Sequence, residues 1–390
     1  MNANMSFIPY SCQDVDDSDV EAVTRVLRSE FLTQGPTVPA FEAAFAARHQ
    51  AGHAVAVSNA TAALHIGCLA LGVGPGTRVW TSPNSFLASA NCALYCGAEV
   101  DFVDIDPATR NMCVTALEAK LEHAKAQGRL PRVVIPVDFA GFPCDLREMR
   151  TLADRYGFAI LQDASHATGA SYLGQPVGSA WADATVFSFH AVKIVTTAEG
   201  GVITTRDDAL ERRLRLLRSH GMTRDPAEME GNSEGPWFYE QVALGYNYRL
   251  TEVQAALGLS QLKRLQIMHA RRTALADRYD ALLAGLPLRL PARAEDRVSS
   301  WHLYAVELDP TRTQRTRAEI FAAMRTAKIG VNVHYIPIHA QPYYRRMGFK
   351  LGDFPAAEEY YARAISLPLF PTMTISQHQE VVSIIMRLLA

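Results

Sequence analysis

The chain has 390 residues, of which 48% are hydrophobic and 20% are charged, as in an ordinary globular protein with a large core. Its 38 lysines and arginines nearly balance 40 aspartates and glutamates, and no basic block stands out, which argues against a nucleic-acid or anionic-membrane partner. No apolar run approaches the roughly 18 residues of a membrane span, and the first residues lack a secretory pattern, so we expect a cytoplasmic protein.

Cysteine and histidine spacing gives no sign of a metal site. Cys92 and Cys96 lie four residues apart in a predicted helix, but no second cysteine or histidine pair lies near them in the sequence. The histidines include no HExxH motif. We therefore expect reduced thiols that pack in the core and an enzyme without a bound metal.

Strand and helix patterns alternate through the first two thirds of the chain. Amphipathic helices are predicted at 17–29 and 38–48. Strands follow at 54–57, 78–81, 100–105, 132–138, 158–163, 185–189 and 201–205, with helices opening at 58–65 and spanning 88–95, 116–126, 145–156 and 207–219. This alternation predicts an α/β fold with a mostly parallel seven-stranded sheet covered on both faces.

The last third has a different pattern. A polar connection at 220–236 precedes a long helix that begins at residue 251 and runs to about 283. Strands at 303–308 and 331–338, with helices at 317–327, 356–364 and 377–389, predict a smaller C-terminal α+β domain. We expect a large domain over 1–250 with an N-terminal arm, a linking helix over 251–284, and a small domain over 285–390.

Lys193 is an isolated lysine between two predicted strands. Its neighbours Ala191, Val192, Ile194 and Val195 are uncharged, and burial among them would lower its pKa. At the ordinary pKa of about 10.4, only about one lysine in 2500 is neutral at pH 7, so a nucleophilic lysine needs such a shift. A lysine whose ammonium reaches water from a strand end is the other interpretation, and the more usual one for this residue alone.

A turn from strand to helix at 58–62 could bind phosphate. Free amides at a helix N-terminus, with the hydroxyl of Ser58 or Thr61, suit an anion. Ser58 or Asn59 could instead be a simple N-cap, and the sequence does not separate the two interpretations.

Asp163 ends a predicted strand that is apolar from Phe158 to Leu161, so its carboxylate lies at the edge where open α/β sheets bind ligands. A buried carboxylate there needs a cationic partner, either an arginine or a protonated pyridine nitrogen. An aspartate on that nitrogen and a lysine Schiff base are what proteins contribute to pyridoxal phosphate chemistry. Phe86 could stack on a cofactor ring and His166 could bond its phenolic oxygen, although both could equally be core residues.

Two further segments offer polar groups. Thr251 is the expected N-cap of the long helix, which leaves Asn247 and Arg249 outside the helix and free to reach an anion. His334 and Tyr335 alternate on the predicted strand 331–337, so one of them is expected to face a cleft while the other packs.

Together these segments resemble the DegT/DnrJ/EryC1/StrS family of sugar aminotransferases, which have the fold-type I architecture of pyridoxal-phosphate-dependent transferases. The motifs occur in the family's order, at 58–64 (SNATAAL), 163–166 (DASH), 187–201 (FSFHAVKIVTTAEGG) and 245–252 (GYNYRLTE). The commoner family loop reads TTGEGG, and this chain has Ala198 at the first glycine, a change that leaves the expected chemistry intact.

Within the family, the resemblance extends to members that act in pseudaminic acid biosynthesis. It rests on segments 8–10 (IPY), 31–35 (FLTQG), 80–83 (WTSP), 219–222 (SHGM), 333–335 (VHY), 341–344 (QPYY) and 365–371 (ISLPLFP). It implies conversion of UDP-2-acetamido-2,6-dideoxy-β-L-arabino-hex-4-ulose to UDP-4-amino-4,6-dideoxy-N-acetyl-β-L-altrosamine, with L-glutamate as the amino donor and ping-pong kinetics.

The resemblance also implies roles for individual residues. Lys193 would bond the aldehyde of pyridoxal 5'-phosphate, Asp163 would hold the ring nitrogen protonated, and Phe86 would stack on the ring. Thr61, Ala62 and Ser188 would bind the phosphate, Asn247 would reach it from the neighbouring subunit of a homodimer, and His166 would lie near the phenolic oxygen. The residues implied to line the substrate site are Tyr10, Glu30, Phe31, Leu32, Thr33, Ala60, Ser188, Asn247, Arg249, Val333, His334 and Tyr335.

Four other functions are weighed against this one. The chain could aminate another nucleotide-linked keto sugar, or be a non-catalytic regulator that binds pyridoxal phosphate or a nucleotide sugar. Family dehydratases carry histidine in place of the lysine, and Lys193 argues against that chemistry. A P-loop or Rossmann nucleotide enzyme would need GxxxxGK[ST] or GxGxxG, and the chain has neither pattern.

Overall fold

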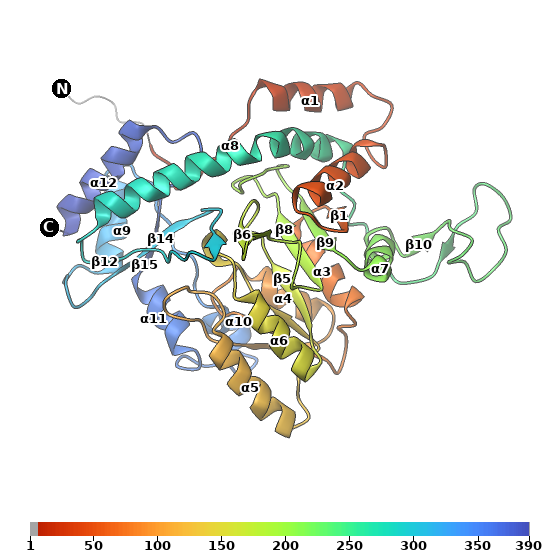
Figure 1. Ribbon diagram of the computed structural model, residues 1–390, viewed down its shortest axis with the longest axis horizontal. Helices are drawn as coiled ribbons and strands as arrows, with labels where there is room; N and C mark the ends of the chain where they lie inside the picture. The colour runs from red at the N-terminus through yellow and green to blue at the C-terminus, as the bar shows by residue number, and fades with distance from the viewer. Residues whose placement is uncertain (1–6, 390) are drawn as a thin grey trace.

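A central sheet of seven strands organises the computed structural model, which describes residues 7–389 (Figure 1). In spatial order the strands are β1 (His53–Val57), β9 (Gly201–Thr205), β8 (Ala184–Ser188), β5 (Ala159–Asp163), β4 (Val133–Ile135), β2 (Arg78–Thr81) and β3 (Glu99–Phe102). Neighbouring strands are parallel except at β9, which runs antiparallel to both β1 and β8. The predicted mostly parallel sheet is confirmed.

Helices cover both faces of this sheet, because successive strand residues alternate between two apolar layers. Leu161 packs with α3 (Ala60–Ala70), α4 (Ala88–Tyr95) and α7 (Asp208–Arg218) on one face. Its neighbour Ile160 packs with α5 (Val114–Ala126) and α6 (Leu146–Tyr156) on the other, where α2 (Thr37–Arg48) also lies against the sheet. The result is a three-layered α/β unit.

The long helix α8 (Glu252–Leu283) joins this unit to the C-terminal part. Thr251 caps it as predicted, since the Thr251 hydroxyl accepts from the Gln254 amide and the Gln254 side chain accepts from the Thr251 amide. Residues of its first half, such as Leu265, pack with the sheet unit, while residues of its second half, such as Tyr279, belong to the C-terminal core. Helix α1 (Asp17–Leu27) lies along α8 (Figure 1). The domain limits at 250 and 284 stay a prediction.

The C-terminal part contains a small antiparallel sheet of β12 (Leu288–Arg289), β14 (Tyr304–Leu308) and β15 (Ala364–Leu367). Helices α9 (Arg317–Thr326), α11 (Pro355–Arg363) and α12 (Ile375–Leu389) accompany it, close to the predicted ranges. The short helix α10 (Pro342–Arg345) completes this part.

The predicted strand at 331–338 is wrong. Only Asn332 forms a bridge, with Ser366 of β15, and β15 takes the place beside β14. The reason is that this segment leaves the small sheet to reach the large one: the Asn332 side chain accepts from the Val333 amide at 2.8 Å, and the Ile338 amide donates to the Pro83 carbonyl at 2.9 Å. Those bonds replace a strand ladder.

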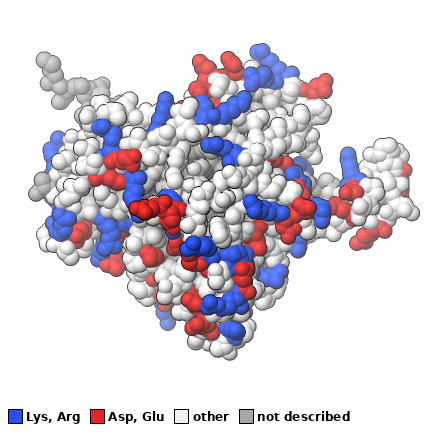
Figure 2. Space-filling view, in the orientation of Figure 1, with Lys and Arg blue, Asp and Glu red and all other residues white. Residues whose placement is uncertain are grey.

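Within the described residues, two further small sheets of short strands lie outside the large sheet and the C-terminal sheet. Strands β6 (Ser171–Tyr172), β7 (Gln175–Pro176) and β13 (Arg297–Val298) form one small sheet. Strands β10 (Met222–Thr223) and β11 (Glu240–Gln241) form a hairpin that projects from the body, where the sequence predicted only a polar connection (Figure 1). Acidic and basic side chains are mixed across the face in Figure 2, and none of the helices within residues 7–389 has the length and apolarity to cross a membrane.

Candidate active site

Several of the predicted site residues meet at the carboxyl edge of the large sheet. Asp163 is the last residue of β5 and Ser188 the last of β8, and these two strands are parallel neighbours. The start of α3 follows β1, and Phe86 follows β2. Because these strands run in the same direction, their following loops lie along one edge, where open α/β sheets bind ligands.

Asp163 is a buried carboxylate that, within residues 7–389, is hydrogen-bonded only to neutral groups. The residue is 4% exposed, and its two carboxylate oxygens accept from the Ser89 hydroxyl at 2.6 Å and the Ser165 amide at 3.1 Å. No arginine forms an ion pair with it in the described part of the chain, so the arginine alternative is not realised. Ser89, which in turn lies 2.7 Å from the Ser85 hydroxyl, was missed from the sequence, although two serines spaced four apart were a signal.

Lys193 lies in the loop between β8 and β9 and is half-buried. Burial lowers the pKa of its ammonium to about 8, and the nearby Asp163 carboxylate opposes part of that shift. At that pKa about one amine in ten is neutral at pH 7, against about one in 2500 for a free lysine. The geometry therefore favours the reactive interpretation of Lys193 over a solvated strand-end lysine.

The start of α3 has both an N-cap and free amides that could bind phosphate, the two interpretations left open by the sequence. Asn59 is the N-cap, and its side-chain oxygen accepts from the Ala62 amide at 2.8 Å. The amides of Ala60 and Thr61 make no hydrogen bond to any part of residues 7–389, so they point out of the helix unpaired. A phosphate contact by the Ala62 amide would replace its bond to Asn59, whereas Ala60 and Thr61 offer free donors.

Gly201 explains why this turn and the lysine loop lie so close together. It pairs with Val57 on one side and with Ser188 on the other. A Cβ at this position would lie 2.8 Å from the Ala60 nitrogen, so only glycine allows the two backbones to approach. At Ala198 the φ angle is +64°, a left-handed value that explains why glycine is commoner there.

His166 is buried and bonded on both ring nitrogens. Nδ1 accepts from the Ala140 amide at 3.3 Å, and Nε2 lies 3.1 Å from the Tyr335 hydroxyl. Burial first, then the charge of Lys193 and the proximity of His334, lower the pKa of His166 well below its usual value, so the ring is neutral. Phe86 lies at the mouth of this group, 59% exposed, with its ring centroid 6.4 Å from that of Tyr335.

The N-terminal segment and residues 333–335 also reach the site. The rings of Tyr10 and His334 are 5.8 Å apart, and the Ser11 hydroxyl donates to the Val192 carbonyl beside Lys193. His334 Nδ1 contacts the Ser366 hydroxyl at 2.8 Å on β15, while Tyr335 turns to His166. The two side chains thus diverge, His334 toward β15 and Tyr335 toward His166, although not through strand alternation. Half-buried Val333 precedes them.

Other predicted residues lie apart from this group. Glu30, Phe31, Leu32 and Thr33 form an exposed segment after α1, where the Leu32 carbonyl accepts from the Glu252 amide of α8. Asn247 is exposed, and Arg249 bridges Val57 through its backbone. Within residues 7–389 no hydrogen bond or ion pair joins any of these side chains to Lys193 or Asp163. A single chain does not bring them to the lysine.

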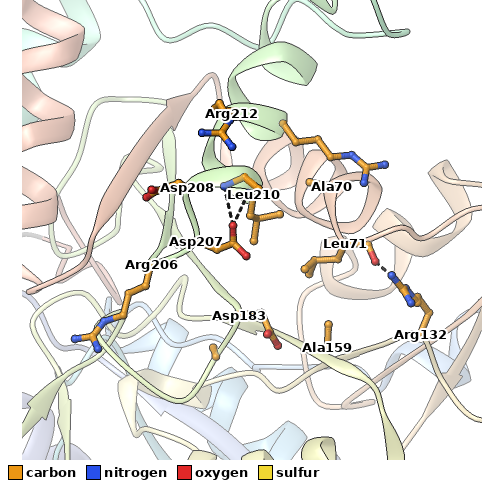
Figure 3. Close-up of a pocket in the computed structure, with 13 residues that line it drawn as sticks. Ala70, Leu71, Arg132, Ala159, Asp183, Arg206, Asp207, Asp208, Leu210 and Arg212 are labelled. Atoms are coloured by element: carbon orange, nitrogen blue, oxygen red, sulfur yellow. Dashed lines mark hydrogen bonds between the residues drawn. The ribbon is translucent and has the colours of Figure 1, made fainter. Parts of the chain in front are cut away.

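A cavity of about 900 Å³ lies at the opposite edge of the sheet (Figure 3). It sits where β5 and β8 begin, and its acids are bonded within the chain: Asp183 accepts from the Ile160 amide and pairs with Arg150, and Asp207 accepts from two amides of α7. Amino ends of parallel strands are not where such sheets bind substrates, so we place the active site at the other edge.

The comparisons with known proteins identify the family. A sequence model of the DegT/DnrJ/EryC1/StrS aminotransferase family matches residues 13–386. The chain belongs to this family. It is 40% identical to the spore coat polysaccharide biosynthesis protein SpsC of Bacillus subtilis, over 96% of this chain and 95% of SpsC.

Solved structures of sugar aminotransferases share the fold. Helicobacter pylori PseC, an aminotransferase involved in the biosynthesis of pseudoaminic acid, superposes with a TM-score of 0.89 at 30% identity, covering 98% of this chain and 99% of PseC. The PLP-form of the putative sugar aminotransferase Spr1654 from Streptococcus pneumoniae gives a TM-score of 0.87 at 30% identity, covering 98% and 100% of the two chains. The fold-type I architecture and the resemblance are confirmed.

Enzymes of this family depend on pyridoxal phosphate, and the residues of this chain fit it. Asp163 is a buried carboxylate without an arginine partner, as a pyridinium requires. The unpaired amides of Ala60 and Thr61 suit the phosphate, and the exposed ring of Phe86 suits a flat heterocycle.

Proposed function

We propose that this family member aminates C4 of a UDP-linked 4-keto sugar, UDP-2-acetamido-2,6-dideoxy-β-L-arabino-hex-4-ulose, with L-glutamate as donor, in pseudaminic acid biosynthesis. The amino transfer rests on one observation above all: half-buried Lys193, with its pKa lowered to about 8, beside the buried carboxylate of Asp163. The choice of sugar rests on the likeness to PseC over nearly the whole chain. The product is UDP-4-amino-4,6-dideoxy-N-acetyl-β-L-altrosamine.

Asp163 and Ser89 hold the ring nitrogen in its reactive state. Bound pyridoxal phosphate supplies a carbonyl that takes up the amino group and a protonated ring that draws electrons from the reacting carbon. The Asp163 carboxylate keeps a proton on the ring nitrogen because burial makes an uncompensated negative charge costly. The Ser89 hydroxyl, 2.6 Å from the carboxylate, orients it from behind.

Lys193 holds the cofactor and moves the proton. A neutral Nζ would condense with the cofactor aldehyde and release water. Once the donor amine displaces Nζ, the free Lys193 amine would take the proton from the glutamate α-carbon and deliver it to the former aldehyde carbon. In the second half-reaction Lys193 would take that proton back and deliver it to C4 of the sugar. The partial neutralisation by burial makes the amine available near neutral pH, because general bases act best with a pKa close to the working pH.

The remaining site residues bind and orient. Thr61, Ala62 and Ser188 receive the phosphate at the start of α3, and Phe86 stacks on the ring. Tyr10, Val333, His334 and Tyr335 line the sugar side, since the rings of Tyr10 and His334 are 5.8 Å apart and Ser11, next to Tyr10, donates to Val192 of the lysine loop. Ala60 shares the turn that Gly201 approaches, and we assign it to the boundary between the phosphate and the sugar.

A second candidate is amination of another nucleotide-linked keto sugar for a polysaccharide. The observation that favours it is the 40% identity to a spore coat polysaccharide protein, which exceeds the 30% identity to PseC. A regulator without catalysis is disfavoured by the shifted pKa of Lys193.

Product analysis separates these candidates. The holoenzyme is incubated with glutamate and, in parallel, with UDP- and dTDP-linked 4-keto sugars and a 3-keto sugar, and products are read by mass spectrometry and NMR. We expect an amine at C4 of the UDP-linked sugar, with ring-proton coupling constants that match the altro configuration. Preferred amination of a different sugar would contradict the proposed substrate, and no amination of any sugar would contradict the proposed activity.

We further propose a homodimer with shared active sites. Asn247 and residues 30–33 carry family positions of the site yet lie on the surface of one chain. Large apolar side chains are exposed in the same parts of the chain, with Leu244 at 78%, Trp237 at 69%, Leu32 at 52% and Phe31 at 49%. A second copy that covers these side chains would bring its Asn247 to the phosphate of the first and its Arg249 nearby.

Subunit complementation tests this arrangement. Lys193→Ala and Asn247→Ala chains are each expected to be weakly active, and refolding them together creates mixed dimers with one intact site if the two residues act across the interface. Random mixing would then restore about a quarter of wild-type activity. Residues that act within one chain would leave the mixture no more active than Asn247→Ala alone. Light scattering of the wild type gives the oligomeric state independently.

A further inference from the structure

Three groups in the site form a directed chain of hydrogen bonds. The Ala140 amide can only donate, so Nδ1 of His166, 3.3 Å away, must be the unprotonated ring nitrogen. The neutral ring then carries its hydrogen on Nε2 and donates it to the Tyr335 hydroxyl oxygen at 3.1 Å. Tyr335 is thereby an acceptor from His166, and its own hydrogen points elsewhere.

The hydroxyl hydrogen of Tyr335 has no acceptor in the described part of the chain. Its one hydrogen-bond partner within residues 7–389 is His166. Burial first, then the charge of Asp163 and the proximity of Tyr10, raise the pKa of Tyr335, so the hydroxyl keeps its proton. The Tyr335 oxygen already accepts a hydrogen bond from His166, so its hydrogen is available to donate to an oxygen of a bound ligand.

The order of strands places this donor on a definite side of Asp163. The phosphate turn and Ser188 belong to β1, β9 and β8, while Asp163 ends β5 and Ala140 follows β4, the next strand beyond. The phosphate group and the phenolic oxygen lie on opposite sides of the axis through the ring nitrogen and the aldehyde carbon in pyridoxal phosphate. A phosphate on the β8 side therefore turns the phenolic oxygen toward His166 and Tyr335.

The C-terminal part fixes the middle of the chain of bonds. The His302 ring lies 4.4 Å from the ring of His166, and the His302 amide donates to the Ala140 carbonyl at 3.0 Å. The Ser300 hydroxyl donates to the His166 carbonyl at 2.6 Å. Gly141 leaves the room for this contact, since a Cβ there would meet the Ser300 oxygen at 2.2 Å. Both the Ala140 amide and the His166 ring are thus held in place.

We propose that Tyr335 is the hydrogen-bond donor to the phenolic oxygen of bound pyridoxal phosphate, and that His166 is a positioning residue that fixes the direction of the Tyr335 hydroxyl. The proposal rests on the proposed function in assigning Lys193 and Asp163 to the cofactor. It changes the expected role of His166, whose Nε2 is engaged by Tyr335 and does not itself meet the cofactor. It also assigns Tyr335 to the cofactor, beyond its implied place beside the sugar.

Cofactor binding tests the donor directly. Apoenzymes of the wild type, Tyr335→Phe and the surface control Tyr343→Phe are titrated with pyridoxal phosphate and with its analogue that lacks the phenolic oxygen. We expect Tyr335→Phe to bind pyridoxal phosphate about tenfold more weakly than the wild type does, with little change for the analogue. Equal losses for the two ligands would overturn the proposal, because the effect would then not pass through that oxygen.

A spectroscopic titration tests the positioning role. A donor to the phenolic oxygen favours its deprotonated form, so loss of the donor raises the pH midpoint of the visible absorbance of the bound cofactor. We expect the midpoint to rise in Tyr335→Phe, to rise less in His166→Leu, and to return toward wild type in His166→Gln, which keeps an N–H for Tyr335. An unchanged midpoint in both Tyr335→Phe and His166→Leu would overturn it, and His166→Leu serves as the test if Tyr335→Phe does not fold.

These measurements use the cofactor without any sugar. A wild type that binds pyridoxal phosphate but aminates none of the keto sugars tested would contradict the proposed substrate. The cofactor titrations would still test the Tyr335 proposal in that case. Conversely, confirmed C4 amination with no difference between Tyr335→Phe and Tyr343→Phe in cofactor affinity would overturn only the Tyr335 proposal.

Discussion

The two edges of the large sheet both carry acidic and basic groups, yet they differ in how those groups are satisfied. At the amino edge, Asp183 and Asp207 accept backbone amides of the same chain around a cavity of about 900 Å³. At the carboxyl edge, Asp163 has only neutral partners, Lys193 has a lowered pKa, and two helix amides are unpaired. Buried polar groups without partners within the chain and groups with a shifted pKa indicate an active site. The volume of a cavity alone does not.

Among the changes at the two edges, removal of Lys193 should cause the largest loss of turnover. We expect Lys193→Ala to lose more than about a thousandfold in turnover and the visible absorbance of the covalently held cofactor, because both the bond and the base are lost. Lys125→Ala, on the exposed face of α5, is the matched control and should keep wild-type kinetics. Steady-state assay and absorbance spectra of the purified proteins measure both effects. Normal turnover in Lys193→Ala would exclude the proposed mechanism.

A pair of aspartate variants compares the two edges directly. Asp163→Asn should lower kcat by roughly a hundredfold or more, since a neutral amide no longer holds the ring nitrogen protonated. Asp183→Asn loses a partly exposed ion pair with Arg150 and should change kcat by less than about twofold, with up to about 1 kcal/mol of stability lost. Kinetic assay and chemical unfolding of both variants give these values. Similar losses of kcat in the two would break the distinction between the edges.

The lowered pKa of Lys193 predicts a pH dependence in the apoenzyme. With a pKa of about 8, the neutral fraction of the amine rises about tenfold between pH 7 and pH 9, and the rate of covalent cofactor capture should rise with it. Stopped-flow absorbance after mixing apoenzyme with pyridoxal phosphate follows this rate. A rate that keeps rising steeply above pH 9 would place the pKa near that of a free lysine.

The same shift affects stability. Unfolding returns the Lys193 pKa to about 10.4, so between the two pKa values the unfolded chain binds more protons and stability increases with pH. Below about pH 8 the buried lysine costs the apoenzyme its full penalty, and Lys193→Met should be the more stable protein there. The advantage of Lys193→Met, measured by urea unfolding, should shrink toward about pH 10, and a constant advantage would contradict this.

The smallest predicted effect concerns Ala198. Its φ of +64° is strained for alanine, and glycine removes that strain while adding freedom to the unfolded chain. We expect Ala198→Gly to gain less than about 1 kcal/mol of stability with unchanged kcat. Urea unfolding of the holoenzyme measures it, and a clear loss of stability would show that the loop geometry differs from the one described.

Much of the fold and part of the site followed from the sequence. The strands of the large sheet were predictable because each is a short apolar run between turn residues, and the α8 cap because Thr251 and Gln254 form a capping box. Asp163 and Lys193 could be selected from the sequence as candidate site residues because an isolated charge among apolar residues is rare. The role of Asn59 as a cap was open, and the structure shows a cap beside two free amides.

The features that the sequence did not predict depend on contacts between segments far apart in the chain. The apolar run at 331–338 has the composition of a strand, but its amides bond to Asn332 and Pro83, so β15 pairs with β14 instead. Ser89 and Ala140 touch Asp163 and His166 only because β2, β4 and β5 end at one edge. Local patterns carry no information about such pairings.

The reversal of β9 has a consequence for engineering. Because β9 returns antiparallel to β8 and Ser188 faces Gly201, the connecting residues 189–200 begin and end about one strand spacing, ~4.8 Å, apart. The lysine therefore lies on a segment whose two ends are clamped by neighbouring strands, with no crossover helix to maintain. Parts of such a segment can be varied: libraries that keep Lys193, the glycine at 201 and the buried Phe189, Ile194 and Val195 would vary the active-site rim while the strand order stays as it is.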